Sequence, residues 1–184
     1  MEFVPLRDTV LNYLAREDPE LKKVFCGVFP ANKLPPETKW RVFSDAYIVN
    51  TDSAGEPGEH WLAIWTWNRV CEVFDSYDLL LSGYKNPTLQ AWFKQWKEVI
   101  TSDQTLQAMD SYTCGHYALL FLKAKAKNVS FQDFLAQWHS HNLMLNDRRV
   151  GEKIQHLIKT ELTRSDLSCQ QSNVSHSTFC YFYQ

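Results

Sequence analysis

The chain has 184 residues, which predicts one compact domain, and its 45% hydrophobic and 14% aromatic residues are enough to bury a substantial core. The charge is almost balanced, at −2, without the excess of Lys and Arg that is typical of nucleic-acid-binding domains. No apolar run reaches the about 20 residues that cross a bilayer, and the N-terminus lacks a secretory signal.

The N-terminal part predicts short helices, a loop and a strand. Asp8 is expected to cap a short helix with apolar residues on one face. Asp18 is expected to start a second helix, because Pro19 then stands at the first helical position. Residues 27–36 contain Gly and three Pro, which indicates a loop. Residues 46–50 form a short, mostly apolar run that is typical of a strand.

The central segment predicts a β-hairpin. Residues 60–67 alternate, and both faces are largely apolar, which is typical of an interior strand covered on both sides. Residues 68–69 indicate a tight turn into a second strand, 70–74. His60 then begins one strand and Asp75 follows its antiparallel partner, so we expect these two side chains to be neighbours.

The second half alternates helices with polar loops. Helices are predicted over 87–96, from Cys114 onward, from Ser130 to Trp138 and from Asp147 onward, and 99–102 is a candidate edge strand. From Ser165 the helical pattern is lost, so we expect a domain over 1–164 and a polar tail over 165–184. An α+β fold follows, with a central mixed sheet flanked by helices and a buried helix that begins at Cys114.

The sequence offers weak candidates for a basic patch and for a metal site. Three lysines alternate near the end of the apolar helix, at Lys123, Lys125 and Lys127. We expect them to form a solvated face that complements the helix dipole. Three candidate metal ligands lie in the polar tail, at Cys169, His176 and Cys180. Their spacing fits no common zinc pattern, so we expect no metal. The odd number of cysteines, five, favours free thiols in a reducing, intracellular compartment.

Cys114 stands where a polar loop enters the apolar helix. A thiol there lies at the positive end of the helix dipole, which favours the thiolate, the nucleophilic form of cysteine. A single cysteine at such a place is more often a small buried hydrophobic residue. The assignment therefore depends on the neighbouring residues.

His60 is the candidate base, because a neighbouring imidazole removes the thiol proton or forms a thiolate–imidazolium pair. Asp75 is the candidate acid, since a carboxylate on the far ring nitrogen selects the tautomer. Asp78 competes for this role, and Asp75 has the alternative role of capping the strand end. The hairpin geometry favours the pair of His60 and Asp75.

Gln107 lies seven positions before Cys114 and is the candidate side-chain donor of an oxyanion hole. Together with the backbone N–H of Cys114, its amide would stabilise the negative oxygen of a tetrahedral intermediate. Gln104 is the alternative donor. Each residue alone is a weak signal, but the order His, acid, Gln, Cys is specific and predicts a cysteine hydrolase.

With these residues in place, the sequence resembles the adenovirus endopeptidase (adenain) family, including the proteases of Maverick/Polinton-type elements and adintovirus-like viruses. The resemblance covers roughly residues 25–162. Residues 48–51 with His60 and Trp61 are similar to that family's histidine motif, and residues 73–75 are similar to its acid motif. Gln107 with Cys114 and Gly115 is similar to its oxyanion-hole and nucleophile motif. Residues 143–146 are similar to a further segment of the family. Asp75 stands where adenoviral enzymes have Glu.

The resemblance implies a cysteine endopeptidase with a papain-related core in permuted order. Such an enzyme would cleave viral capsid or core precursor proteins after small residues such as Gly during virion maturation. It implies Trp61 and Gly115 as substrate-binding residues in a narrow cleft, although Trp61 fits core packing equally well. A monomer located in the host nucleus or cytoplasm and in the virion would follow, without a membrane partner.

Activation is where the chain departs from that family. Adenoviral enzymes are activated by DNA and by a disulfide-linked viral peptide. The slightly acidic charge argues against DNA activation, and Trp96 stands near where the peptide-linking cysteine would fall. We expect no required cofactor, with an activating peptide supplied in trans, or in cis by residues 179–183 as an added strand. A tail without that role is the alternative.

Two other functions stay open at this point. A deubiquitinase- or deSUMOylase-like isopeptidase shares the order of the site residues, and its acid matches Asp75, but it usually places the Gln one residue nearer the Cys. An inactive protease fold that serves as a binding module is the other alternative. The presence of all four residue types argues against it.

Overall fold

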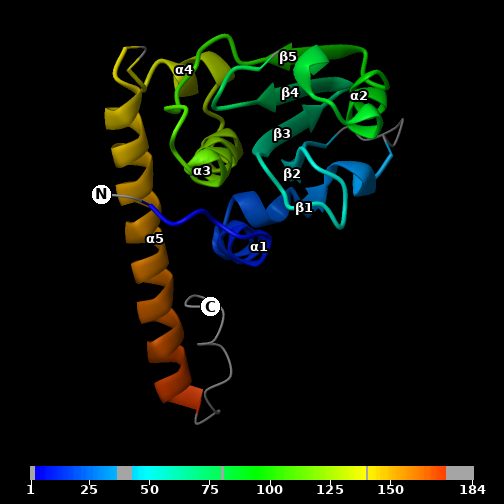
Figure 1. Ribbon diagram of the computed structural model, residues 1–184. Coiled ribbons are helices and arrows are strands. Elements are labelled where there is room, and N and C mark those ends of the chain that lie inside the picture. The colour runs from blue at the N-terminus through cyan, green and yellow to red at the C-terminus, as the bar shows by residue number, and fades with distance from the viewer. Residues whose placement is uncertain (1–2, 37–42, 80, 140, 173–184) are drawn as a thin grey trace.

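The computed structural model describes residues 3–36, 43–79, 81–139 and 141–172 (Figure 1). Its strands are β1 (Phe25–Pro30), β2 (Asp45–Asn50), β3 (Trp61–Trp67), β4 (Val70–Phe74) and β5 (Glu98–Thr101). Its α-helices are α1 (Asp8–Glu17), α2 (Pro87–Phe93), α3 (Cys114–Ala126), α4 (Phe131–Leu135) and α5 (Leu143–Ser172). Within this part of the chain, no helix has both the length and the apolar character of a membrane span.

The strands form one mixed sheet in the order β1-β2-β3-β4-β5. Both outer pairs are parallel and both inner pairs are antiparallel. The predicted hairpin is confirmed: β3 and β4 are joined by Asn68 and Arg69, whose φ angles are 43° and 65°. Two consecutive positive φ angles give the two-residue turn that matches the twist of a hairpin.

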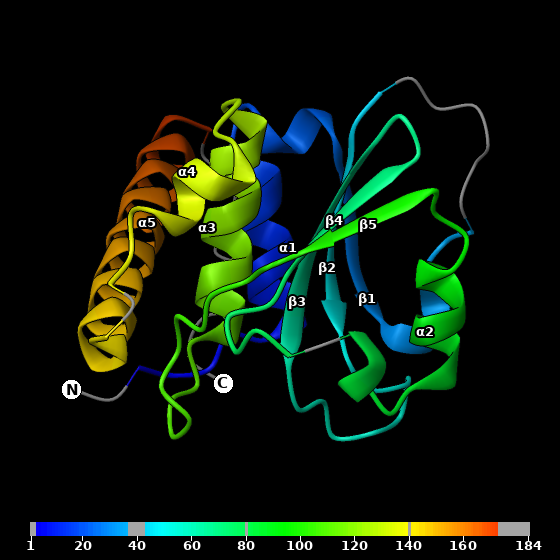
Figure 2. The same cartoon turned by 90° about the horizontal axis from the view of Figure 1, so that it is seen from above.

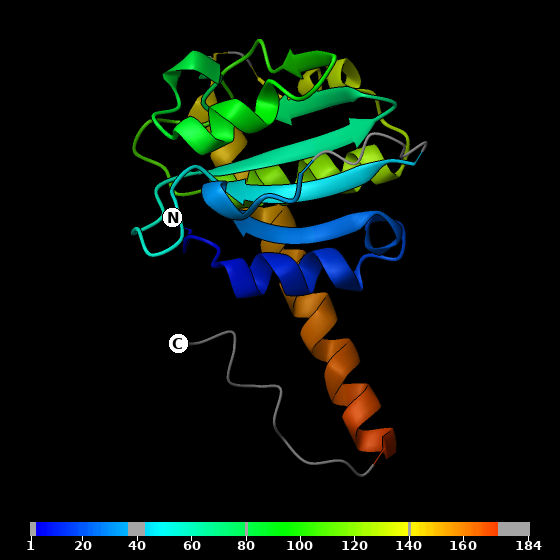
Figure 3. The ribbon, with the colours of Figure 1, turned by 90° about the vertical axis from the view of Figure 1, so that its right-hand side faces the viewer.

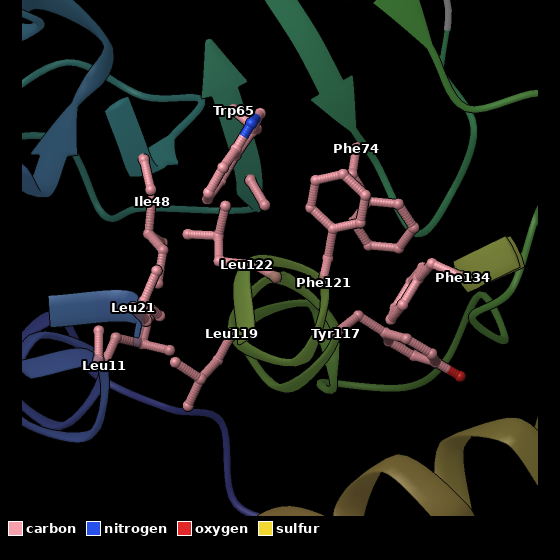
Figure 4. Close-up of a cluster of buried hydrophobic side chains, with 14 of the residues drawn as sticks. Leu11, Leu21, Ile48, Trp65, Phe74, Tyr117, Leu119, Phe121, Leu122 and Phe134 are labelled. Atoms are coloured by element: carbon pink, nitrogen blue, oxygen red, sulfur yellow. The ribbon is translucent and has the colours of Figure 1, made fainter. Parts of the chain in front are cut away.

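Hydrophobic clusters cover both faces of the sheet. Figure 2 shows the helices on its two sides, α2 on one and α1, α3, α4 and α5 on the other. Along β3, Ala63 and Trp65 face the cluster formed with α1, α3, α4 and α5, whereas Leu62 and Ile64 face the cluster formed with α2. The first cluster is rich in aromatic rings, which Figure 4 shows around the core face of α3. Covering on both sides explains why β3 has two apolar faces, and it fixes the position of α3 against the sheet.

Two expectations about secondary structure were wrong. Residues 27–36 were expected to be a loop, but β1 runs through Phe25–Pro30 as an edge strand with an irregularity next to Gly27, whose φ is 145°. An edge strand tolerates Pro30, because the missing N–H faces no partner strand. Asp18 begins only a 3-10 turn, Leu21–Lys23, where its carboxylate accepts the Leu21 N–H at 2.8 Å.

The last helix also differs from the expectation. It begins at Leu143 rather than after Asp147, and it continues to Ser172, past Ser165, where the helical pattern was expected to end. No Gly or Pro interrupts 165–172, so propagation of the helix is not blocked there. Figure 3 shows that α5 passes α1 and extends beyond the sheet. Residues 179–183 lie outside the described residues.

The lysines of α3 are not a solvated face. Lys123 Nζ lies 2.7 Å from Asp18, and Lys125 Nζ lies 2.7 Å from Glu72, with little of these side chains exposed. Only Lys127, at the end of the helix, is exposed. Positions two residues apart lie on different sides of a helix, so the two inner lysines can reach two separate carboxylates. They hold α3 to its neighbours and form no basic patch.

Candidate active site

The fold brings together the residues that the sequence singled out. His60 directly precedes β3, and Asp75 directly follows β4, so the hairpin places them side by side. Cys114 is the first residue of α3, and Gln107 lies in the segment between β5 and α3. Because α3 packs on the sheet, the free Cys114 thiol at its N-terminus lies beside the end of the hairpin.

The buried ion pair of the site is His60 with Asp75. Nε2 of His60 lies 2.7 Å from Oδ1 of Asp75, and the two residues are 7% and 2% exposed. Asp75 also accepts hydrogen bonds from the Tyr84 hydroxyl, at 2.5 Å, and from the backbone N–H of Tyr77 and Leu79. Burial alone would raise the pKa of Asp75, but the interaction with His60, followed by the hydrogen bonds from Tyr84 and the Tyr77 N–H, outweighs burial and lowers the pKa. The carboxylate is therefore ionised and can fix the imidazole.

The opposite ring nitrogen of His60 is the one available to the thiol. Nδ1 is buried without a hydrogen bond of regular geometry, while the Cys114 thiol is close enough to act on the ring. Burial lowers the pKa of His60, but the interactions with Asp75 and Cys114 prevail and raise it from 6.5 to about 9. At neutral pH the ring is protonated, which suits a thiolate–imidazolium pair.

Gln107 is fully buried, at 0% exposure, and its amide is held on both sides. The Ser76 hydroxyl donates to Oε1 at 2.7 Å, which fixes the orientation of the amide. Nε2 donates to the Tyr77 hydroxyl at 3.0 Å and to the Ser111 carbonyl at 2.7 Å. An amide has two N–H donors. Both are in use, so an oxyanion can be bound only when one of these bonds is exchanged.

Two tyrosines of the site were missed by the sequence reasoning. Tyr84 donates to Asp75, and the Tyr77 ring lies on the His60 ring, with centroids 4.9 Å apart and planes at 31°. Burial, and then the charge of Cys114, raise the pKa of Tyr77 to about 12, so its hydroxyl stays neutral. The hairpin register, continued beyond Ala63 and Phe74, sets Tyr77 opposite His60, whereas no spacing rule links Tyr84 to the histidine.

The competing residues do not take the places of Asp75 and Gln107, although the backbone N–H of Asp78 donates to the Asp75 carbonyl at 3.1 Å. Asp78 is half-exposed in a turn with φ of 56°, and His60 pairs with Asp75 instead. Gln104 is half-exposed, unlike the buried Gln107.

The residues next to His60 and Cys114 in sequence pack closely together. A Cβ atom on Gly115 would lie 3.2 Å from Cδ1 of Trp61, so the glycine allows the indole to reach the first turn of α3. Trp61 is half-buried and packs on the core. This contact accounts for its core-packing role and also places it beside the thiol-bearing turn.

The site borders a cavity and contains no metal cluster. A cavity of about 500 Å³ opens beside His60 and is lined mainly by 51–53 and 83–87. Within the described ranges, no three His, Cys, Asp or Glu side chains are grouped as metal ligands. The tail candidates (Cys169, His176 and Cys180) have no described side chains.

Comparison with solved structures identifies the fold as that of a cysteine protease. In particular, the chain is similar to the African swine fever virus (ASFV) pS273R protease, with a TM-score of 0.50 and 17% identity over 81% of this chain and 70% of that chain. The selenomethionine form of that protease gives a TM-score of 0.50 and 15% identity, over 81% of this chain and 71% of that chain. The SUMO protease Ulp1 gives a TM-score of 0.40 and 12% identity, over 78% of each chain. The sequence matches no family model and no curated protein. The predicted α+β cysteine-protease fold is confirmed.

Proposed function

We propose that this protein is a cysteine endopeptidase with Cys114 as its nucleophile. The observation that carries the proposal is the buried contact of 2.7 Å between His60 Nε2 and Asp75 Oδ1, next to a free thiol at the N-terminus of α3. His60 is the acid–base residue and Asp75 orients it. The Gln107 amide and the backbone N–H of Cys114 are the oxyanion donors.

The reaction follows from this arrangement. The Cys114 thiolate attacks the scissile carbonyl carbon, and the electron pair of the C=O bond moves to the oxygen. The Nδ1–H of His60 then gives its proton to the leaving amine as the C–N bond breaks, which leaves a thioester. Neutral His60 takes a proton from water, whose oxygen attacks the thioester. The carboxylic product leaves as the thiolate is released.

The proposed substrates are viral capsid or core precursor polypeptides, cut after small residues such as Gly. This part of the proposal rests on the resemblance to adenain-like proteases. Close packing of Trp61 against Gly115 supports it, because an indole beside the thiol-bearing turn leaves little room for a large side chain next to the scissile bond. An activating peptide remains part of the proposal, and activation by DNA does not.

A peptide panel tests both the reaction and its specificity. We expect cleavage of fluorogenic peptides with Gly-Gly before the scissile bond, and loss of cleavage in Cys114→Ser and His60→Ala. Peptides with Leu or Phe at these positions should be poor substrates. Faster release of SUMO or ubiquitin from lysine adducts than cleavage of any Gly-Gly peptide would instead assign the site to the isopeptidase class.

A further inference from the structure

Asp147 has a position that its expected role does not explain. It was expected to cap the last helix, but α5 begins at Leu143, and the Asn142 side chain accepts the Leu145 N–H at 3.0 Å. The carboxylate of Asp147 is therefore not needed at the helix end. Instead it lies one turn inside α5, is 8% exposed, and faces the segment that leads into Cys114.

Asp147 binds both ends of that segment. Its Oδ2 accepts the backbone N–H of Ala108 at 3.0 Å, directly after Gln107. Its Oδ1 accepts the Thr113 hydroxyl at 2.9 Å, directly before Cys114. The Tyr117 hydroxyl, one turn into α3, lies 3.1 Å from the same oxygen. One carboxylate thus spans the loop between the candidate oxyanion donor and the candidate nucleophile.

The preceding residue of α5 holds the other side of Gln107. Asn146 is fully buried, and its Nδ2 lies 3.2 Å from the carbonyl oxygen of Leu106 and 2.7 Å from that of His139. The Tyr117 hydroxyl also lies 3.0 Å from the Leu106 carbonyl oxygen. The backbone is therefore anchored immediately before and immediately after Gln107, and both anchors come from one turn of α5.

A buried carboxylate is costly unless hydrogen bonds compensate for its lost hydration. Asp147 accepts from the Ala108 N–H and the Thr113 hydroxyl, and it shares the single O–H of Tyr117 with the Leu106 carbonyl; these donors belong to the loop or to the first turns of α3. The next residue, Arg148, pairs with Glu152 on the exposed side of α5 instead. The buried charge of Asp147 is thus committed to the loop that carries the site.

We propose that Asp147 is a positioning residue for the reaction. It fixes the backbone at Gln107 relative to Cys114, so that the Gln107 amide, once one of its hydrogen bonds is exchanged, binds the same oxyanion as the backbone N–H of Cys114. This inference rests on the proposed protease function. It assigns Asp147 no contact with the substrate. It also separates two properties of the site: the reactivity of the thiol depends on His60, whereas stabilisation of the oxyanion depends on the anchored loop.

Because thiol reactivity and oxyanion stabilisation depend on different residues, the two properties can be measured separately. Alkylation of a thiolate by iodoacetamide develops no oxyanion on a carbonyl held by the enzyme, so it does not need the position of Gln107. Peptide cleavage does need it, and a misplacement of about 1 Å can cost about 100-fold in rate. In Asp147→Asn, an NH₂ group replaces one of the two carboxylate oxygens. This group cannot accept a hydrogen bond, so one donor of the loop loses its partner.

The experiment compares Asp147→Asn with Glu152→Gln, which makes the same change of charge on the exposed side of the same helix. We expect Asp147→Asn to lower kcat for a Gly-Gly peptide by about 100-fold, with KM within about threefold of the wild type. The alkylation rate of Cys114 should stay within about twofold. Glu152→Gln should change none of the three. An unchanged kcat, or a loss of alkylation in parallel with kcat, would overturn the inference.

A milder variant covers the case in which Asp147→Asn does not fold. Thr113→Val removes the hydroxyl that binds Asp147 at the nucleophile end of the loop and that also lies 2.8 Å from the Ser111 hydroxyl. It should give the same pattern with a smaller loss of kcat. An unchanged kcat here would contradict the inference. If the wild type neither cleaves peptides nor is labelled at Cys114, the proposed function itself fails. If it does both and the Asp147 variant keeps its kcat, only the positioning role fails.

Discussion

Replacement of Tyr77 by Phe tests how the oxyanion site is occupied before a substrate arrives. The Tyr77 hydroxyl and the Ser111 carbonyl accept the two amide hydrogens of Gln107, at 3.0 and 2.7 Å. A bound oxyanion needs one of these hydrogens, so one bond has to break during the reaction. Phe at this position keeps a ring against His60 and removes the competing acceptor, together with the hydrogen bond of 3.0 Å that the hydroxyl donates to the Ser111 carbonyl.

The expected size of the effect follows from that single bond. A neutral hydrogen bond contributes about 1 kcal/mol net, and about 1.4 kcal/mol corresponds to a tenfold change in rate. Tyr77→Phe should therefore raise kcat/KM for a Gly-Gly peptide about fivefold. Since Tyr77 is half-exposed, the free energy of unfolding of the Tyr77→Phe variant should be lower than that of the wild type by no more than about 1 to 2 kcal/mol.

The assay is steady-state cleavage of a fluorogenic peptide, corrected for the fraction of active thiol. Tyr112→Phe is the matched control, because Tyr112 lies in the segment between β5 and α3 that carries Gln107, but is 57% exposed. It should leave kcat/KM unchanged. A tenfold loss of kcat/KM in Tyr77→Phe, with an unchanged melting temperature, would refute the reasoning. It would mean that the hydroxyl supports the productive position of Gln107 rather than competing with the oxyanion.

Three further predictions concern the buried charges. Tyr84→Phe removes a hydrogen bond of 2.5 Å to Asp75, and it should lower the free energy of unfolding by about 2 kcal/mol, measured by thermal melts, with a severalfold loss of kcat. Asp18→Asn breaks the pair with Lys123 and should lower the free energy of unfolding by about 2 kcal/mol at pH 7. Because the pKa of Asp18 is lowered in the fold, this difference from wild type should be lost as the pH falls below about 4, as measured by urea titrations. The pKa of His60 is raised from 6.5 to about 9, so its stabilising contribution is complete below pH 6.5 and is lost as the pH rises through about 9. The difference in the free energy of unfolding between wild type and His60→Ala should shrink over that range by up to about 3 kcal/mol. A constant difference would contradict the ion pair of His60 with Asp75.

The hairpin and the helix that begins at Cys114 were predictable because their signals are local. Alternation along β3, the turn at Asn68 and Arg69, and the apolar run after Cys114 each follow from a short stretch of chain. Once the hairpin is drawn, His60 and Asp75 fall at the same end of it, although the register, with Ala63 opposite Phe74, does not set them directly opposite each other. The interrupted β1 gave no such signal, because Gly27 and Pro30 are as typical of a loop as of an irregular edge strand.

The supporting residues of the site could not be predicted, because their partners are distant in sequence and lie in aperiodic loops. Asp147 binds Ala108 across 39 residues, and Gln107 binds Tyr77 across 30. Asp147 even had a sufficient local explanation as a helix cap. Its real partners depend on where α5 begins, which is a boundary that sequence patterns define poorly.

The central claim is that His60 activates Cys114, and the pH-dependent alkylation rate of that thiol tests it most directly. At pH 7 a thiol with an ordinary pKa is only about 3% thiolate. Proton removal by His60 should therefore make Cys114 react faster than a free cysteine, by less than about 30-fold because a more acidic thiolate is a weaker nucleophile. Peptide mapping should place the label on Cys114 and not on Cys71, because burial raises the pKa of the Cys71 thiol. His60→Ala should lose the rapid phase. Equal rates in the wild type and His60→Ala would contradict the claim.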